Sequence, residues 1–307
     1  MAVTAGMVKE LREMTGVGMV ECKNALVEAD GNIEKAVELL REKGLAAAAK
    51  KAGRVASEGL VHAIITDDNK VGVVVEVNSE TDFVAKNQEF RSFVENVALQ
   101  VVSTSSKDVE SLLNDKWVEN DATTVKDVLT QKISVIGENL NIRRFEKFEK
   151  LNSGKLVSYI HGGGRVSVLV ELSCEKECDQ LTEVGKNICM QIAAMSPKFV
   201  SRENVPQDFI DKEREILTQQ ALNEGKPENI VSKMVEGRID KELKNFCLTE
   251  QEYVKDGDLT VKKYLESVGK EVGADVKIER FVRFETGEGI EKKEENFADE
   301  VNKVMQG

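Results

Sequence analysis

The sequence predicts an α+β fold that consists of an N-terminal three-helix module, a duplicated core and an inserted antiparallel helical hairpin. Three observations support this prediction. The N-terminal segment shows helical periodicity alone, and two later segments repeat the same order of β-hairpin, helix and third strand. The second repeat is longer than the first, and its extra residues again show helical periodicity. Mixed strands and helices in this order favour a sheet with one face covered by helices.

Residues 4–43 contain three short helical stretches, each bounded by residues that begin or end helices. The apolar stripe of the first stretch ends at Gly16, and that of the second ends at Gly31. Asn32 is a favourable N-cap for the third stretch, which we expect to stop at Gly44. The pattern of a glycine loop, an apolar helix and a D-G-N turn is similar to that of ubiquitin-associated domains. A basic, alanine-rich segment (45–54) follows; it is helical by propensity and is interpreted as a linker.

Each copy of the duplicated core begins with an apolar hairpin. LVHAII-TDDNK-VGVVVEV (60–77) and KLVSYI-HGGGR-VSVLVEL (155–172) both alternate about a polar or glycine-rich turn, as β-hairpins do. A helical stripe of apolar residues follows each hairpin. Both copies then close with a third strand, in GENLNIRRFEKF (137–148) and GADVKIERFVRF (273–284). This internal duplication predicts two related core subdomains.

The second copy is longer because a helical segment is inserted at about 196–247. Two stretches of helical periodicity, 207–223 and 228–246, are joined by a Gly-Lys-Pro turn and predict an antiparallel hairpin. We expect its seam to contain Ile210, Leu217, Ala221, Ile230, Met234 and Ile239. Such hairpins are used for self-association, so one interpretation is a homodimer through residues 207–246. The other is a hairpin packed flat on its own domain.

The predicted domain boundaries follow these segments. The four predicted parts are a ubiquitin-associated-like module and linker (1–55), a first core subdomain (56–148), a second core subdomain with the insert (149–286), and a C-terminal module (287–307). In the last part, Phe297, Val301 and Val304 predict a final helix.

Composition limits the classes of partner. The 307 residues include 55 acidic and 43 basic side chains and carry a net charge of −12, which disfavours a phosphate backbone as the main partner, so we expect no direct nucleic-acid binding. No apolar run approaches the roughly 18–20 residues that cross a bilayer, and the N-terminus shows no signal or transit peptide. The five scattered cysteines favour a reducing compartment. We therefore expect a cytoplasmic protein with no membrane partner.

The sequence contains no recognisable motif of catalysis or metal binding. The two histidines, His62 and His161, have no second catalytic group nearby in the sequence and are interpreted as structural. Cys174 and Cys178 lack a companion pair at zinc-site spacing, and no phosphate-binding glycine motif occurs. We expect no metal, no cofactor and no covalent chemistry, and hence a protein that works by binding. The roles of Cys174 and Cys178 stay open.

Five segments together resemble translation elongation factor Ts, and they follow one another through essentially the whole chain. They are MVKELREMTGVGMVECKNALVEADGNIEKAVELLREKG, EVNSETDFVAKN, IGENLNIRRF, YIHGGGRVSVLVEL and RFETGEGIEK. The resemblance implies a guanine-nucleotide exchange factor that binds elongation factor Tu with GDP and promotes the release of Mg²⁺ and GDP, so that GTP can bind. It also implies a helical hairpin used for dimerisation and a C-terminal module that touches the partner.

The resemblance further implies which residues act on the partner. In this family a T-D-F-V stretch enters the GTPase domain and leads to loss of its Mg²⁺ ion, and the matching residues here are Thr81, Asp82, Phe83 and Val84. The broad interface that exchange requires is expected to include Val8, Leu11, Met19, His161, Gly162, Arg283 and Phe284.

Two alternatives stay open at this point. Ser79-x-x-Asp82 has the spacing of a capping box, which would make Phe83 an ordinary core residue of the first helical turn. Asp82 itself either acts by charge near the metal of the partner or only caps the helix. The alternative function is a ubiquitin-associated-like adapter that binds another folded protein through residues 14–18 and has no exchange activity.

Overall fold

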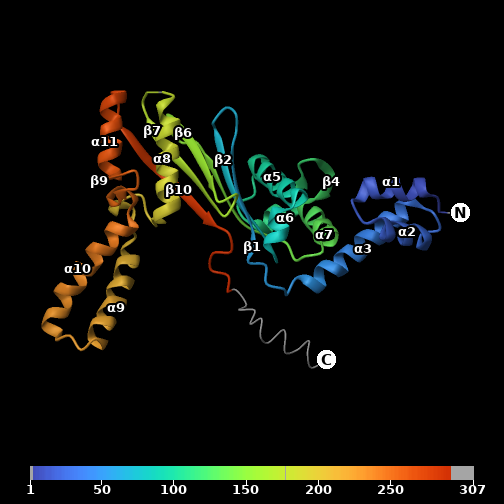
Figure 1. Ribbon diagram of the computed structural model, residues 1–307, viewed down its shortest axis with the longest axis horizontal. Coiled ribbons are helices and arrows are strands. Elements are labelled where there is room, and N and C mark those ends of the chain that lie inside the picture. The colour runs from blue at the N-terminus through green and yellow to red at the C-terminus, as the bar shows by residue number, and fades with distance from the viewer. Residues whose placement is uncertain (1–2, 177, 292–307) are drawn as a thin grey trace. The chain divides into compact units, whose positions relative to one another are not determined.

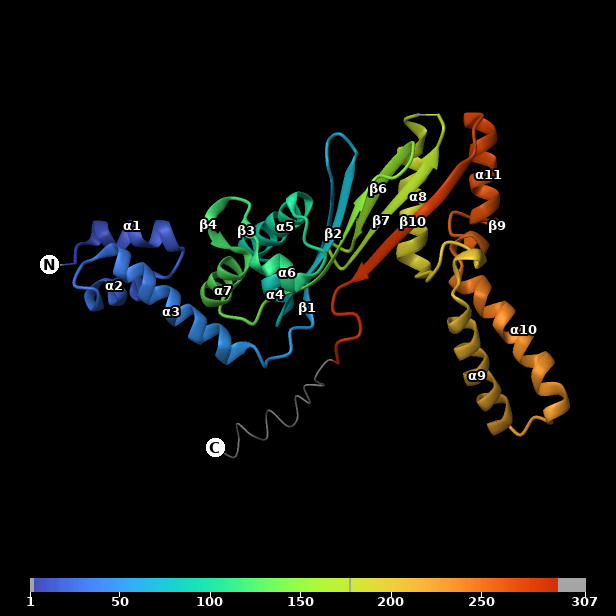
Figure 2. The ribbon, with the colours of Figure 1, turned by 180° about the vertical axis from the view of Figure 1, so that it is seen from behind.

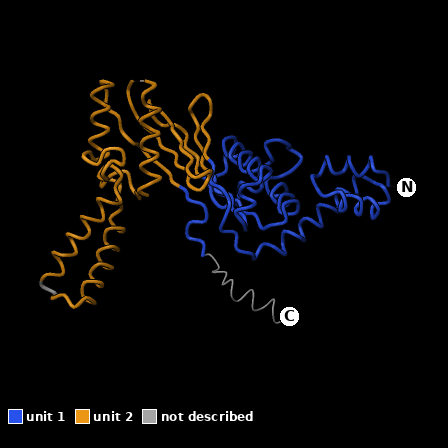
Figure 3. Tube along the Cα trace, in the orientation of Figure 1, with its two compact units in different colours: residues 1–62, 75–145, 284–307 blue, residues 63–74, 146–283 orange. Residues whose placement is uncertain are grey.

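The computed structural model describes residues 3–176 and 178–291. The chain forms two compact units, which are coloured separately in Figure 3. Unit 1 contains residues 1–62, 75–145 and 284–307, and unit 2 contains residues 63–74 and 146–283. Helices and sheets are both present, so the α+β prediction is confirmed. The predicted final helix lies outside the described residues.

Three helices form the N-terminal module of unit 1 (Figure 1). They are α1 (Ala5–Thr15), α2 (Met19–Glu28) and α3 (Ile33–Lys51). The side chain of Asn32 accepts a hydrogen bond from the Lys35 amide at 3.0 Å, which is the predicted N-cap. Their core contains Val8, Leu11, Cys22, Ala25, Leu26, Ala29, Ala36 and Leu40.

The sequence predicts that the third helix stops at Gly44, but the helix continues past this residue. It continues to Lys51, because the alanine-rich residues after Gly44 favour a helix and no residue there breaks it. Gly44 is buried against α7 (Val125–Ile136), where an added Cβ would lie 3.8 Å from Ser134. Gly44 therefore lies inside the helix, in contact with α7, and does not end it.

The first repeat has the predicted order of hairpin, helix and third strand. Its three-stranded sheet has the order β1-β2-β5, formed by β1 (Glu58–Ile65), β2 (Val71–Ser79) and β5 (Asn141–Glu149). The helices between β2 and β5 are α4 (Asp82–Lys86), α5 (Gln88–Ser103), α6 (Val109–Asn114) and α7. The predicted stripe of α5, from Phe90 to Val101, is buried. Helical periodicity therefore located this helix correctly.

The second repeat has the same order. Its sheet is β10-β7-β6, formed by β6 (Gly154–His161), β7 (Val166–Cys174) and β10 (Val276–Glu285). The hairpin register runs from Gly154 opposite Ser173 to His161 opposite Val166. Helix α8 (Gln180–Met195) packs against β6 and β7, and its predicted stripe is buried in the core of unit 2.

The duplication extends further than the sequence analysis found. Each copy has a small hairpin before its last helix, β3–β4 (Lys116–Trp117, Asn120–Thr124) and β8–β9 (Glu252–Tyr253, Asp256–Thr260). The second of these hairpins leads into α11 (Val261–Val272), as the first leads into α7. Trp117 pairs with Asn120, and Tyr253 pairs with Asp256, so the two hairpins have the same register.

A buried glutamine holds each small hairpin. Gln100 of α5 donates to the Lys116 carbonyl at 3.1 Å and accepts from the Val118 amide at 2.6 Å. Gln191 of α8 makes the equivalent pair of bonds to Glu252 and Val254, at 3.0 and 2.8 Å. A buried polar side chain is tolerated when its hydrogen bonds are satisfied, which explains why a glutamine interrupts the apolar stripe of both helices.

The inserted hairpin consists of α9 (Gln207–Asn223) and α10 (Glu228–Phe246), with the predicted bounds. The two helices lie side by side in Figures 1 and 2 and contact each other along their length. Their seam contains Leu217, Ala221, Val231, Val235 and Ile239. Ile230, which was expected in the seam, is 47% exposed. Val231 and Val235 lie in the seam together with the expected Ile239, and the expected Met234 packs against its edge.

A buried glutamate occupies the middle strand of each sheet. Glu76 on β2 and Glu171 on β7 are both fully buried. The carboxylate of Glu76 lies 3.0 Å from Arg143 and 2.5 Å from Arg144, and that of Glu171 lies 2.8 Å from Arg280. A buried carboxylate needs such partners, because its desolvation is costly when it stands alone. The acids therefore fix the third strand of each copy.

The same arginines also contact aromatic rings in a reciprocal arrangement. Arg144 on β5 lies over the ring of Phe284 on β10, and Arg280 on β10 lies over the ring of Phe148 on β5, both at 4.2 Å from the ring centroid. Each ring therefore comes from the other repeat, although each pair lies within one unit. The division into units falls inside both third strands, after residue 145 in β5 and after residue 283 in β10.

The buried acid of unit 2 gives a stability prediction. We expect Glu171→Ala to lower the free energy of unfolding by roughly 3–5 kcal/mol, because Arg280 and the Leu151 amide lose a buried partner. Urea unfolding followed by circular dichroism measures the change. The matched control is Glu13→Ala, which removes an exposed pair with Lys9 and is expected to change stability by less than about 1 kcal/mol. Equal effects of the two substitutions would contradict the role given to Glu171.

Candidate functional site

Phe83 extends into solvent from a one-turn helix in unit 1. Its side chain is 80% exposed, the highest value among the large hydrophobic residues that the structure describes. Helix α4, which carries it, lies between β2 and α5, and Ala85 is its buried residue. The alternative in which Phe83 is a core residue of the first turn is therefore wrong. An exposed ring of this size is a suitable anchor for an apolar slot on another protein.

The helix that carries Phe83 is capped at both ends. Thr81 is the N-cap, and its hydroxyl accepts a hydrogen bond from the Val84 amide at 3.4 Å. Asn87 ends α4 and begins α5, because its side chain accepts from the Glu89 amide at 2.7 Å. Ser79 does not form a capping box with Asp82; it is buried, and its hydroxyl donates to the Thr81 carbonyl at 3.0 Å. The caps therefore fix the direction of this short helix.

Asp82 is the first residue of α4 and not its cap, so the interpretation of this residue as a helix cap is wrong. Its carboxylate is exposed and lies 2.6 Å from the ammonium group of Lys86, one turn further along. The hydrogen bond from Lys86 lowers the pKa of Asp82 below its ordinary value. The side chain is thus a carboxylate at neutral pH, and Lys86 also lies 6.0 Å from the centroid of the Phe83 ring.

The loop before α4 is tied to the end of α7 by Glu138. One carboxylate oxygen of Glu138 accepts hydrogen bonds from the amides of Glu80 and Thr81, both at 3.0 Å. The other accepts from the Thr81 hydroxyl at 2.6 Å. In return, the Glu80 carboxylate accepts from the Asn139 amide at 2.6 Å. Arg54 lies 3.5 Å from Glu80 and offsets part of the negative charge.

The other residues expected to contact a partner in unit 1 differ in exposure. Met19 at the start of α2 is 44% exposed and is accessible. Val8 and Leu11 are 7% and 0% exposed, because they form the core of the helical module. Phe284 is 8% exposed and lies under Arg144. The side chains of Val8, Leu11 and Phe284 therefore support the fold, and contact of these residues with a partner stays a prediction.

The expected contact residues of unit 2 lie at a turn and on a strand. His161 ends β6 and is exposed, and its Nδ1 atom lies 3.0 Å from the hydroxyl of Tyr159. Gly162 follows in the left-handed conformation, with φ of 59°, which a side chain would disfavour. Arg283 is half-buried on β10. The turn at His161 and Gly162 is therefore the accessible part of this set.

Cysteines and acids do not form a metal centre in the part of the chain that the structure describes, where no group of three metal-ligating side chains was found. The five cysteines are free thiols. Cys174 is buried in the core of unit 2, and Cys178 packs against the same core. Burial raises the pKa of Cys189 well above its ordinary value, so this thiol is unreactive. The contacts that the structure shows for Cys174 and Cys178 are thus packing contacts. No helix within residues 3–176 and 178–291 is long and apolar enough to span a bilayer.

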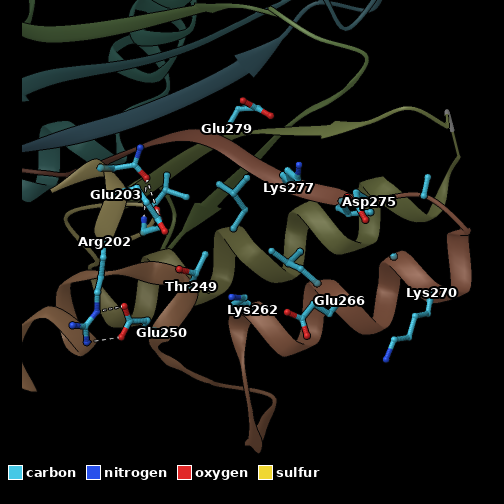
Figure 4. A pocket seen from close by; sticks show the side chains of 18 of the residues that line it. Arg202, Glu203, Thr249, Glu250, Lys262, Glu266, Lys270, Asp275, Lys277 and Glu279 are labelled. Carbon is cyan, nitrogen blue, oxygen red and sulfur yellow. Dashed lines mark hydrogen bonds and ion pairs between the residues drawn. The ribbon is translucent and has the colours of Figure 1, made fainter. Parts of the chain in front are cut away.

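A hollow of unit 2 lies between α11, β10 and the loops around Arg202 (Figure 4). It encloses about 1180 Å³, and its lining mixes apolar residues such as Leu265 and Ile278 with charged ones. Its most strongly paired group, Arg202, is held by Asp240 at 2.8 Å and by the carboxylate of Glu250. These carboxylates raise the pKa of Arg202. Because this guanidinium is already engaged, it serves the fold and is not a free anion-binding group.

Comparison with known proteins agrees with this architecture. The family model described as elongation factor TS matches residues 80–288. The chain is 57% identical to elongation factor Ts of Clostridium novyi (strain NT) over 303 residues, and 55% identical to that of Clostridioides difficile (strain 630) over 303 residues; each match covers 99% of both chains. That of Clostridium kluyveri (strain NBRC 12016) is 57% identical over 305 residues, again with 99% of both chains covered.

These matches define first a class, the elongation factors of protein biosynthesis. Within this class, the chain belongs to the elongation factor Ts family.

Exposure of Phe83 predicts that its removal leaves the fold intact. We expect Phe83→Ala to change the free energy of unfolding by less than about 0.5 kcal/mol, because the ring packs on little of its own chain. Leu11→Ala, by contrast, should lower it by about 2–5 kcal/mol through loss of buried contacts. Urea unfolding of the two variants measures both values. A loss above about 2 kcal/mol for Phe83→Ala would show that the ring is packed in the fold.

Proposed function

We propose that this chain is a guanine-nucleotide exchange factor that binds elongation factor Tu with GDP and promotes the release of Mg²⁺ and GDP, so that GTP can bind. The observation that carries the proposal is the exposed ring of Phe83, presented on a capped helix within the sequence Thr81-Asp82-Phe83-Val84. Membership of the elongation factor Ts family supports the identity of the partner. In this proposal the chain promotes exchange by binding alone, without covalent chemistry or a cofactor. It acts in the cytoplasm.

One ring alone cannot supply the free energy that exchange requires. Coupling between two ligands is reciprocal, so a loss of nucleotide affinity must equal the preference of the factor for nucleotide-free partner. A ten-thousandfold loss needs about 5.5 kcal/mol, whereas burial of one Phe side chain yields about 1.5–3 kcal/mol. Displacement of Mg²⁺ removes further nucleotide affinity, because the ion bridges phosphate oxygens and protein ligands. The remainder requires a wide interface.

The accessible residues on both units are candidates for that wide interface. Met19 on the helical module and the turn at His161 and Gly162 on unit 2 present exposed groups. Asp82 adds a carboxylate beside the Phe83 ring, and we propose that it acts by charge on groups around the metal of the partner. In this arrangement Phe83 is the wedge and the other surfaces hold the partner in place.

Self-association through α9 and α10 is a separate proposal. The apolar residues of the seam are already buried between the two helices of the hairpin. A second copy would therefore have to bind residues outside the seam. Exposed apolar side chains there are Ile216, Leu222 and Ile230, at 43%, 38% and 47% exposed. Sedimentation of the purified chain tests this proposal: a dimer that dissociates on Ile230→Glu supports it, and a monomer at micromolar concentration contradicts it.

Release of fluorescent GDP from elongation factor Tu, followed by stopped flow, tests the proposed function. Phe83→Ala is expected to slow release at saturating factor by about 10- to 150-fold, which corresponds to the burial of one Phe side chain. Leu99→Ala is the matched control, because it removes another exposed apolar side chain of unit 1 and should leave the rate unchanged.

Two results would contradict the proposal. A wild-type chain that does not accelerate GDP release is not an exchange factor. A chain that captures the GTPase equally well with and without excess GDP and Mg²⁺ is an adapter, which would favour the ubiquitin-associated-like module as the binding element.

A further inference from the structure

Phe83 can act as a wedge only if the loop that carries it is held in one conformation. The helix around it has one turn, and a helix of this length is unstable by itself. Its position therefore depends on contacts made before and after it. The activity of a site is proportional to the fraction of molecules in which the site is formed. Residues that fix this loop therefore contribute directly to function.

Glu138 makes three of these contacts with a single carboxylate. It accepts the amide hydrogens of Glu80 and Thr81 and the hydroxyl hydrogen of Thr81, at 3.0, 3.0 and 2.6 Å. The Thr81 hydroxyl can then use its lone pair to accept from the Val84 amide, which is the N-cap bond of α4. The chain of bonds thus runs from Glu138 through Thr81 to the first turn of the helix that holds Phe83.

The anchor of this carboxylate is itself fixed. Glu138 follows Gly137, which ends α7 in the left-handed conformation with φ of 87°. The next residue, Asn139, donates its amide hydrogen to Glu80 and its side-chain amide hydrogen to the Arg54 carbonyl. The two loops therefore hold each other by bonds in both directions. Such two-way contacts restrict the loop more than a single hydrogen bond does.

The second repeat provides an internal comparison. Counting from the buried acids Glu76 and Glu171, the position of Thr81 is occupied by Lys176. Counting from the glycines that end α7 and α11, the position of Glu138 is occupied by Ala274. In that copy the Lys176 ammonium group donates to the Val272 carbonyl at 3.2 Å. The carboxylate clamp thus occurs in the repeat that carries the exposed phenylalanine, and the other repeat has replaced both of its parts.

We propose that Glu138 is the positioning residue of the exchange reaction: its carboxylate holds residues 80 and 81 so that α4 presents Phe83 in a fixed direction. The inference rests on the proposed exchange function and deepens it. Glu138 is half-buried beneath the loop and acts through Thr81, so it need not touch the partner. Loss of this carboxylate should lower the rate of the step that follows binding and leave the affinity of initial binding nearly unchanged.

The test measures GDP release from elongation factor Tu over a range of factor concentrations. Glu138→Ala is expected to lower the rate at saturation by about 10-fold, through a smaller fraction of chains with a formed loop, while the half-saturating concentration changes by less than about 3-fold. Glu138→Gln retains an oxygen for the two amides and should stay within about 3-fold of the wild-type rate. Glu110→Ala on α6 removes an exposed glutamate of the same unit and is the matched control.

A double-mutant cycle separates a positioning role from a general effect on the fold. If Glu138 acts through Phe83, then Glu138→Ala combined with Phe83→Ala is no slower than Phe83→Ala alone. Hydrogen exchange of the Glu80 and Thr81 amides should also become at least about 10-fold faster in Glu138→Ala, because these amides lose their acceptor. Both measurements remain valid for a variant with a lowered melting temperature.

Three results would overturn the inference while leaving the exchange function intact. The first is a rate of GDP release with Glu138→Ala that equals the wild-type rate. The second is a double variant in which the rate losses of Glu138→Ala and Phe83→Ala multiply. The third is unchanged hydrogen exchange of the Glu80 and Thr81 amides. Failure of the proposed function is distinguishable from all three, because the wild-type chain would then not accelerate GDP release at all.

Discussion

In each repeat a carboxylate buried on the middle strand holds an arginine of the third strand, and this ion pair fixes the third strand against the sheet of its own repeat. Glu76 and Glu171 each accept a bond from such an arginine and from a backbone amide beyond the end of a third strand, that of Gly287 for Glu76 and that of Leu151 for Glu171. Because neither acid is stable when buried alone, the chain must bring these strand ends together. The loop that leads to Phe83 begins at residue 80, directly after β2 and four residues beyond Glu76. The ion pairs of Glu76 therefore fix the strand from which this loop starts.

The two repeats share their buried polar groups but differ in their loops. Gln100 and Gln191 hold the small hairpins in the same way, whereas the pair of Thr81 and Glu138 is replaced by Lys176 and Ala274. The two copies thus keep the same internal hydrogen bonds and differ in one loop. This accounts for an exposed phenylalanine at that loop in the first copy and not at the matching position of the second.

Periodicity predicted the long elements well, because their ends carry strong local signals such as Asn32 and the turn between α9 and α10. It missed the small hairpins, since a two-residue strand such as Lys116–Trp117 has no periodicity to detect; comparison of the two copies would have found them. The exposure of Phe83 was not decidable locally, because the loop before it is held by Glu138, which is 57 residues from Thr81 in the sequence. The burial of Val8, by contrast, could be predicted locally, because the helical stripe already placed this residue in a core.

The central claim is that the ring of Phe83 acts by displacing the Mg²⁺ ion that holds the nucleotide. The most direct measurement is the release of fluorescent GDP from elongation factor Tu by the wild-type chain and by Phe83→Ala, in millimolar Mg²⁺ and in excess chelator. If the ring works through the metal, the defect of Phe83→Ala is large in Mg²⁺ and nearly disappears when the metal has already been removed. An equal defect in both conditions would contradict the account.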